Sequence, residues 1–219
     1  MSFSLIVFDL DGTLVDSRRD LAESANVLLT ECGSDRLPEE AIGRMVGNGA
    51  PALVARAFAA AGQTPPSDAV ARFLAIYDRR LLNHTRPYPR MAEVLETLAA
   101  RAPLGVLTNK PLAATRSILG GLNLARYFAD EAIVGGDGPF PRKPDPSGLR
   151  HLLARVAVAP AEALLVGDST VDWRTAQNAS TAICLARYGF GFEGVPVGEL
   201  RPGDRVIDAP IDLLAAVQA

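Results

Sequence analysis

Two aspartates that follow the first apolar segment are the most informative candidates for chemistry in this chain. Asp9 and Asp11 stand two residues apart in the segment Asp9–Thr13, directly after Leu5–Phe8. In an extended chain, residues two apart point to the same side, so both carboxylates can address one small volume. Neighbouring carboxylates repel each other unless a cation or a shared proton compensates them. The pair therefore indicates a metal-dependent or acid–base site, with a plain Asp-Gly turn as the structural alternative.

Two later motifs carry groups that can hold a phosphate. Thr108 and Asn109 follow the apolar segment Leu104–Leu107, where a hydroxyl and a backbone N–H can bind a phosphate oxygen. Lys143 stands in a proline-rich loop, and its ammonium group can neutralise a carboxylate or a phosphate. Each motif alone also has an ordinary explanation, because Thr and Asn are good helix N-caps and basic loops are commonly solvated.

The last motif adds further carboxylates. Gly167, Asp168 and Ser169 follow the apolar segment Ala163–Val166, and Asp172 stands four residues after Asp168. This spacing is compatible with a helix start that carries both carboxylates on one side. A small set of hard oxygen ligands suits Mg²⁺, which keeps several waters and binds substrate phosphate. Helix capping by Asp168 or Ser169 is the alternative for this motif taken alone.

The elements that must position these motifs indicate an α/β fold. Short apolar segments alternate with helix-like stretches, as in a doubly wound parallel sheet. The expected strands are Leu5–Phe8, Leu104–Leu107, Ile133–Val134, Ala163–Val166 and Ala182–Leu185, and the expected helices are Met91–Ala100, Leu112–Leu119, Ser147–Val156, Val171–Asn178 and Ile211–Val217. Because the carboxyl ends of parallel strands meet at one edge, we expect the four motifs to converge there.

One part of the chain interrupts the alternation of strands and helices. From Ser17 to about Leu82 the apolar residues have helical spacing, and no convincing strand is present. We expect a small helical domain, residues 16–85, inserted into an α/β core formed by residues 1–15 and 86–219. The segments Leu14–Asp16 and Thr85–Pro89 are the expected hinges.

Composition limits the classes of function. The formal net charge of −3 argues against a nucleic-acid partner and against a polybasic membrane anchor. No apolar segment approaches the roughly 20 residues that a membrane span requires, so we expect a cytoplasmic protein. Cys32 and Cys184 stand far apart and are expected to be reduced thiols. Lys110 and Lys143 are the only lysines, and Lys110 has no predicted role.

Taken together, the four motifs resemble those of the haloacid dehalogenase superfamily of phosphotransferases, in the same order and across the whole chain. The resemblance implies a Rossmann-like parallel-sheet core, a small helical cap after the first strand and Mg²⁺ as cofactor. Asp9 is then the nucleophile that forms an aspartyl-phosphate, and Asp11 is the general acid and base. The resemblance assigns the metal to Asp9, Asp168 and the Asp11 carbonyl, the phosphate to Thr108, Asn109 and Lys143, and supporting roles to Gly12, Thr13, Ser169 and Asp172.

Two further segments, Met45–Ala50 and Tyr188–Gly191, resemble those of bacterial phosphoglycolate phosphatases. The resemblance implies hydrolysis of 2-phosphoglycolate or of a similar small phosphomonoester. Candidate substrate contacts in the cap are Arg44, Gly47, Asn48, Gly49 and either Arg18 or Arg19, with the two glycines expected to shape a loop. The chain departs from the family at Arg90 and Ser180, where its members usually have glycine.

Several alternatives stay open within and outside this superfamily. A phosphatase for sugar phosphates or nucleotides, and a β-phosphoglucomutase-like phosphotransferase, share the same core residues. Asp11 argues against a dehalogenase, and the absence of lysine from residues 17–82 argues against Schiff-base cleavage of phosphonates. A non-enzymatic metabolite-binding protein is disfavoured because every motif is intact. No feature of the sequence indicates the oligomeric state.

Overall fold

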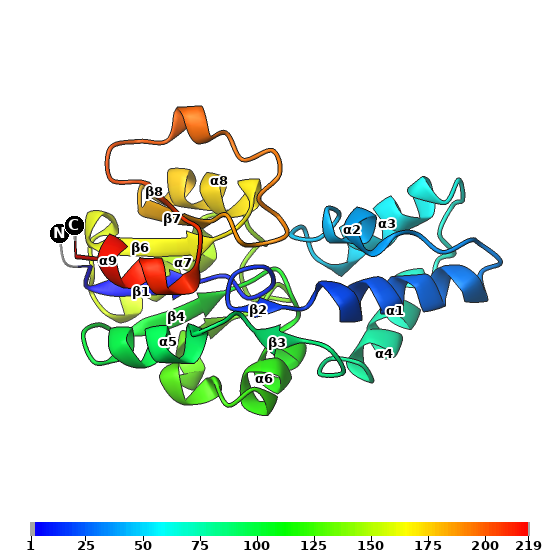
Figure 1. The fold of residues 1–219 in the computed structure, drawn as a ribbon, viewed down its shortest axis with the longest axis horizontal. Coiled ribbons are helices and arrows are strands. Elements are labelled where there is room, and N and C mark those ends of the chain that lie inside the picture. Colours follow the sequence, from blue (N-terminus) through cyan, green and yellow to red (C-terminus); the bar gives the residue numbers. More distant parts are fainter. Residues whose placement is uncertain (1–2, 219) are drawn as a thin grey trace.

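The computed structural model describes residues 3–218 and is built around a six-stranded sheet in the order β5-β4-β1-β6-β7-β8 (Figure 1). Its strands are β1 (Leu5–Phe8), β4 (Leu104–Leu107), β5 (Ile133–Val134), β6 (Ala163–Gly167), β7 (Ala182–Ala186) and β8 (Arg205–Ile207). Every pairing in this sheet is parallel. The α/β class expected from the alternation of strands and helices is confirmed.

Helices cover both faces of the sheet, which explains why its strands are continuous apolar segments. In β1, Ile6 and Phe8 belong to one buried cluster, and Leu5 and Val7 belong to another on the opposite face. The first face packs against α5 (Met91–Ala99), α6 (Leu112–Gly121) and α9 (Leu213–Ala216), and the second packs against α7 (Ser147–Arg155) and α8 (Thr170–Ala179). None of the helices within residues 3–218 combines the length and apolarity needed to cross a membrane.

The five predicted strands are present, with β6 and β7 ending just beyond their predicted ends. The edge strand β8 was not expected, because three residues are too few to show a periodic pattern. The last predicted helix is divided into a 3₁₀ turn, Pro210–Asp212, and the short helix α9. These differences lie away from the strand ends that carry the motifs.

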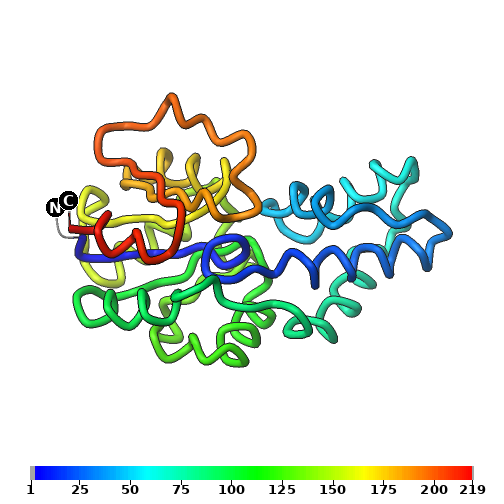
Figure 2. The backbone as a smooth tube through the Cα atoms, in the orientation of Figure 1, coloured from blue at the N-terminus to red at the C-terminus, as the bar shows by residue number. Residues whose placement is uncertain are grey.

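Four helices lie between two short strands that pair antiparallel, β2 (Val15–Asp16) and β3 (Arg86–Pro87). They are α1 (Arg18–Glu31), α2 (Glu39–Gly43), α3 (Ala50–Ala60) and α4 (Ala69–Asp78). The tube drawing shows them projecting from the sheet, with the outgoing and returning chain side by side at their base (Figure 2). All four fall within residues 16–85, and this segment is called the cap below.

Asp20 fastens the base of the cap. It lies in the first turn of α1 and is fully buried. Its carboxylate accepts hydrogen bonds from the backbone N–H groups of His84 and Thr85 and from the Thr85 hydroxyl, at 2.7–3.1 Å. The start of α1 is therefore tied to the chain that returns toward β3.

Arg90 and Ser180 adopt left-handed backbone conformations, with φ of 64° and 60°. Arg90 precedes α5 and Ser180 ends α8. The left-handed region is costly for residues with a Cβ atom, which is why glycine is common at helix ends of this kind. The turns thus keep a conformation that suits glycine even though the chain has other residues there.

Candidate active site

The candidate site lies at the carboxyl ends of β1 and β6, which are neighbours in the sheet. The order of the strands runs from β1 through β4 to β5 on one side and from β6 through β7 to β8 on the other. Such a reversal leaves a crevice at the strand ends, where ligands bind in open α/β sheets. Asp9 directly follows β1, Thr108 follows β4 and Asp168 follows β6, and all three side chains are buried.

Three carboxylates meet in this crevice. Asp9, Asp168 and Asp172 each offer an oxygen atom within 4.8 Å of the others. Asp172 reaches the cluster from the first turn of α8, whose N-cap is Ser169. Asp172 accepts hydrogen bonds from the Ser169 hydroxyl at 2.6 Å and from the Ser169 backbone N–H at 3.1 Å. The sequence of this motif is compatible with helix capping and with a carboxylate cluster, and the structure contains both.

Lys143 lies between two of these carboxylates. Its ammonium nitrogen is 2.6 Å from Asp172 Oδ1 and 2.9 Å from Asp9 Oδ1, and the side chain is almost fully buried. Burial by itself lowers the pKa of Lys143, but the charges of Asp172 and Asp9 outweigh it and hold the pKa above its ordinary value. The side chain is therefore a fixed cation next to Asp9, the residue that the family resemblance implies is the nucleophile.

One ammonium group does not compensate three buried carboxylates. Burial raises the pKa of Asp9 to about 6, although the charge of Lys143 opposes the shift. Burial, together with the charges of Asp172 and Asp9, raises the pKa of Asp168 well above its ordinary value. Both shifts express the cost of keeping like charges together away from water. The cluster is therefore a place where an added cation lowers the free energy.

Asp168 is enclosed by glycines from two distant segments. A Cβ atom at Gly12 or Gly189 would collide with the Asp168 carboxylate. The Gly191 backbone N–H donates to Asp168 Oδ2 at 2.8 Å, and the Thr13 hydroxyl donates to Oδ1 at 3.3 Å. Gly12 and Thr13, expected to support the site, thus touch Asp168, and the Tyr188–Gly191 segment completes the enclosure.

The residues present fit a Mg²⁺ ion. Hard carboxylate oxygens at close quarters are the ligands that this ion takes in proteins. The orientation of Asp168 is already fixed by Gly191 and Thr13, as metal ligands commonly are. Asp9 Oδ1 accepts from the Leu10 backbone N–H at 2.7 Å, so one oxygen of this carboxylate is also held in place.

Asp11, the second aspartate of the first motif, is paired with Lys110 and not with Lys143. The Lys110 ammonium nitrogen is 2.8 and 3.0 Å from the two carboxylate oxygens of Asp11, and the Ser17 hydroxyl donates to Asp11 at 2.5 Å. Burial by itself lowers the pKa of Lys110, but the charge of Asp11 outweighs it and raises the pKa. The sequence indicates no role for Lys110. The one signal that points to it is that lysine is rare in this arginine-rich chain.

Asn109 connects the cap with the core. Its side-chain N–H₂ group donates to the backbone carbonyl of Gly47 at 2.8 Å and to that of Lys143 at 3.0 Å. Both amide protons are therefore engaged by protein carbonyls. The phosphate contact expected of Asn109 consequently depends on its backbone N–H, next to the buried Thr108 side chain.

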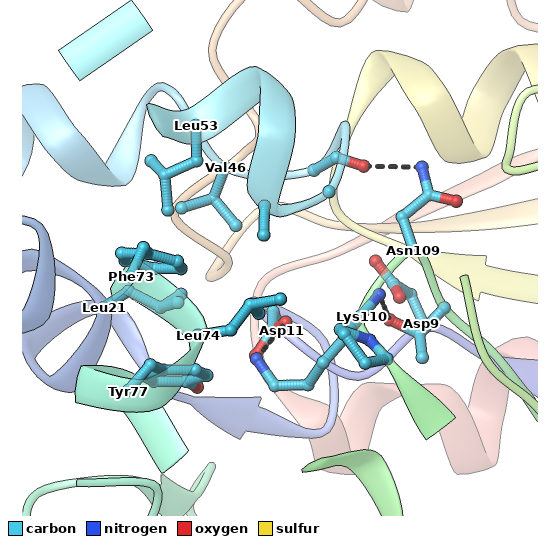
Figure 3. Close-up of a pocket in the computed structure, with 15 residues that line it drawn as sticks. Asp9, Asp11, Leu21, Val46, Leu53, Phe73, Leu74, Tyr77, Asn109 and Lys110 are labelled. Atoms are coloured by element: carbon cyan, nitrogen blue, oxygen red, sulfur yellow. Dashed lines mark hydrogen bonds and ion pairs between the residues drawn. The ribbon is translucent and has the colours of Figure 1, made fainter. Parts of the chain in front are cut away.

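A pocket between cap and core contains Asp9, Asp11 and Lys110 (Figure 3). Its cap wall is mostly apolar and is formed by Leu21, Val46, Leu53, Phe73, Leu74 and Tyr77, together with Gly47 and Gly49. Thr108, Asn109 and Pro111 complete the core side. Asp9, the predicted nucleophile, and Asp11, the predicted acid, thus share one pocket with the apolar wall of the cap.

The polar candidates from the cap lie outside this pocket, and Arg44 and Asn48 line a second cleft together with Ser169 and Gly191. Arg44 is more than half exposed and is 3.7 Å from Glu193. Asn48 accepts a 2.7 Å hydrogen bond from Arg56. Within residues 3–218, neither side chain lines the pocket, and Gly47 and Gly49 do. Arg18 pairs with Asp16 and Glu39, and Arg19 pairs with Glu23.

Comparison with known proteins identifies the chain's relatives. The phosphoglycolate phosphatase of Rhodospirillum rubrum is 45% identical over 199 residues, which are 87% of this chain and 82% of that protein. The phosphoglycolate phosphatase of Haemophilus influenzae is 37% identical over 221 residues, with 97% of each chain covered. The crystal structure of a predicted phosphoglycolate phosphatase from Haemophilus somnus superimposes with a TM-score of 0.88 at 32% identity and covers 98% of each chain.

One family model covers all four motifs and the cap. Residues 6–186 match the model of haloacid dehalogenase-like hydrolases, a span that runs from β1 through β7 and includes the helical insert. The parallel sheet, the acidic cluster at its edge and the buried lysine are the features that the sequence resemblance implied. The chain belongs to the haloacid dehalogenase-like hydrolase family.

Proposed function

We propose that this protein is a Mg²⁺-dependent phosphatase that hydrolyses 2-phosphoglycolate through an aspartyl-phosphate on Asp9. The observation that carries the proposal is the pairing of Asp9 with Lys143 at 2.9 Å, beside two further buried carboxylates and beneath an apolar cap. The relatives named as phosphoglycolate phosphatases support the choice of substrate.

Asp9 acts as the nucleophile in this proposal. One of its carboxylate oxygens attacks phosphorus, the bond between phosphorus and the leaving alkoxide breaks, and an aspartyl-phosphate forms. Asp11 gives its proton to the leaving oxygen, and glycolate departs. Asp11 then takes a proton from water, the water oxygen attacks phosphorus, and the bond to Asp9 breaks to release phosphate.

The other residues of the site stabilise charge that develops on the transferring group. Lys143, the Thr108 hydroxyl and the backbone N–H groups after Asp9 are suited to the phosphoryl oxygens, because fixed donors in a buried site lose little energy to reorganisation. Asp9, Asp168 and the Asp11 carbonyl would hold Mg²⁺, with Asp172 in support. When bound, this ion offsets the repulsion between carboxylates and phosphate.

The apolar cap wall favours a small substrate. A sugar ring brings several hydroxyl groups that need hydrogen-bond partners, and burying a hydroxyl without a partner is costly. The side chains of Val46, Leu53, Phe73 and Leu74 offer none. The wall is therefore better matched to a short carbon skeleton than to a hexose or a nucleoside.

A steady-state screen tests the proposal. Purified protein is assayed for phosphate release from 2-phosphoglycolate, glucose phosphates and nucleoside monophosphates, with Mg²⁺ and with EDTA. We expect the highest kcat/KM for 2-phosphoglycolate, no turnover in EDTA and loss of turnover in Asp9→Asn. Turnover that survives Asp9→Asn or EDTA contradicts the mechanism. Isomerisation of glucose 1-phosphate points to a mutase, and tight binding without any turnover points to a binding protein.

A further inference from the structure

Lys110 is a buried cation whose position in the pocket goes beyond the proposed chemistry. Its side chain is 4% exposed, and its ammonium nitrogen lies 4.5 Å from the centre of the Tyr77 ring, at the boundary between core and cap. A buried ammonium group is expensive unless anions or aromatic faces surround it. Asp11 and Tyr77 supply these contacts, so the charge is held beside the predicted acid and not dispersed in water.

Tyr77 presents a polar group with no partner. The residue is 3% exposed, it belongs to α4 of the cap, and it lines the same pocket (Figure 3). Its hydroxyl makes no well-aligned hydrogen bond with any residue among 3–218, and the polar group that lies near enough to lower its pKa is the Lys110 ammonium. Buried polar atoms are nearly always paired in folded proteins, so this hydroxyl calls for a ligand. Burial raises the pKa of Tyr77 to about 12, which keeps the hydroxyl protonated and able to donate.

Other cations lie near the pocket but do not line it, and one of them is Arg142, which lies beside Gly49. Lys143 is held by Asp9 and Asp172, and the cap arginines that were candidates pair with acidic residues outside the pocket. The cap contains no lysine. Lys110 is thus the one cation among the described residues that line the pocket.

The covalent geometry of the proposed substrate places its carboxylate group close to Lys110. In a 2-phosphocarboxylate a single carbon atom separates the leaving oxygen from the carboxylate carbon, so the two are about 2.4 Å apart. Asp11 must reach the leaving oxygen in the proposed reaction, and Lys110 already touches both oxygens of Asp11. The Lys110 ammonium group, which contacts Asp11, is therefore within a few bond lengths of the carboxylate of the substrate.

We infer that Lys110 and the Tyr77 hydroxyl bind the carboxylate of the substrate and select phosphate esters of small 2-hydroxy acids over neutral esters of the same size. This inference rests on the proposed function, because it names the group by which the proposed substrate is recognised. Lys110 offers a charge-assisted hydrogen bond and Tyr77 a neutral one, from opposite sides of the interface between core and cap.

Comparing an acidic ester with a neutral one tests the inference. The substrates are 2-phosphoglycolate and 2-hydroxyethyl phosphate, which differ mainly in the carboxylate. The variants are Tyr77→Phe, which removes only the hydroxyl, and Lys110→Met, which removes the charge. For Tyr77→Phe we expect kcat/KM to fall about tenfold for the acidic ester and to change less than about twofold for the neutral one. For Lys110→Met both values fall, and the acidic ester loses at least about tenfold more.

The wild-type protein and one further variant distinguish failure of this inference from failure of the phosphatase proposal. Equal fold-losses for both esters in Tyr77→Phe and Lys110→Met show that Lys110 only positions Asp11, which overturns the inference. A wild-type preference for the neutral ester overturns it too, while the phosphatase proposal stands. No wild-type hydrolysis of any ester overturns the phosphatase proposal itself. Arg44→Met is the competing variant: selective loss of the acidic ester there, with none in Lys110→Met, assigns the carboxylate to the cap.

Discussion

The side-chain amide of Asn109 donates a 2.8 Å hydrogen bond to the backbone carbonyl of Gly47, which joins the edge of the core that is predicted to bind phosphate to the cap. The loop that receives this bond has φ of 109° at Gly47 and 85° at Gly49. A Cβ atom at Gly49 would lie 3.2 Å from the Asn109 carbonyl oxygen. The loop thus depends on glycine both for its backbone conformation and for its approach to the core.

Gly49→Ala is expected to weaken catalysis by holding the cap away from the core. Alanine adds a methyl group against Asn109 and Arg142, and we expect kcat/KM for the proposed substrate to fall about tenfold. Gly62→Ala is the matched control, because its φ of 70° carries the same strain but its Cβ would meet no atom within 4 Å. Each variant is expected to lose about 1 kcal/mol of stability, because alanine is strained at a positive φ. Equal kcat/KM in the two variants contradicts a role for this contact in closure.

Asp168→Asn is expected to stabilise the protein in the absence of divalent cations. Because burial raises the pKa of Asp168 in the folded state, that state takes up a proton more readily than the unfolded chain. The stability of the wild-type protein therefore falls as pH rises above about 4, the ordinary pKa of an aspartate. Asparagine does not titrate, so the variant has the higher Tm at pH 8 in EDTA.

Thermal unfolding of the Asp168→Asn variant and the wild-type protein at pH 5 to 8 measures this effect. The difference in Tm is expected to shrink as the pH is lowered, because the wild-type carboxyl then takes up its proton. Mg²⁺ is expected to raise the Tm of the wild-type protein and to have a smaller effect on the variant, because a ligand stabilises the state that binds it. A difference in Tm that does not vary with pH would show that the Asp168 charge is not the cause.

Ser180→Gly is expected to raise the free energy of unfolding by about 1 kcal/mol. Ser180 is exposed and ends α8 with φ of 60°, so glycine relieves backbone strain without removing a buried contact. Ser117→Gly is the control, since Ser117 is also exposed but lies within α6. There the same substitution costs about 0.5 kcal/mol, because glycine disfavours a helix interior. Urea unfolding of both variants checks the opposite signs; two changes of the same sign contradict the explanation.

Asp20→Asn is expected to destabilise the base of the cap by about 2–3 kcal/mol, because a buried charged acceptor of several hydrogen bonds is lost. The amide that replaces one oxygen would face the N–H groups of His84 and Thr85, which are themselves donors. Asp35→Asn, at an exposed position of the same cap, is expected to change stability by less than about 0.5 kcal/mol. Urea unfolding measures both values, and similar values would show that Asp20 does not fasten the cap.

The order of elements was predictable because it depends on local patterns. A strand buried on both faces must be a continuous apolar segment, and Leu5–Phe8 and Leu104–Leu107 are present with their predicted bounds. The strand β8 was not predictable, because its three residues are too few to show that pattern. In the cap, helical spacing indicated α1, α3 and α4, whereas the short α2 was not distinguished.

By itself, the sequence determined which residues can do chemistry, since Asp9, Asp11, Lys143 and Asp168 are recognisable by type, spacing and position after strands. Only the tertiary structure decided which of them touch. Lys110 and Asp11 are 99 positions apart, and nothing local to either residue indicates their contact. Such pairs are set by the order of strands in the sheet and by the packing of the cap on its edge, because burial forces charges to find partners wherever the chain brings them.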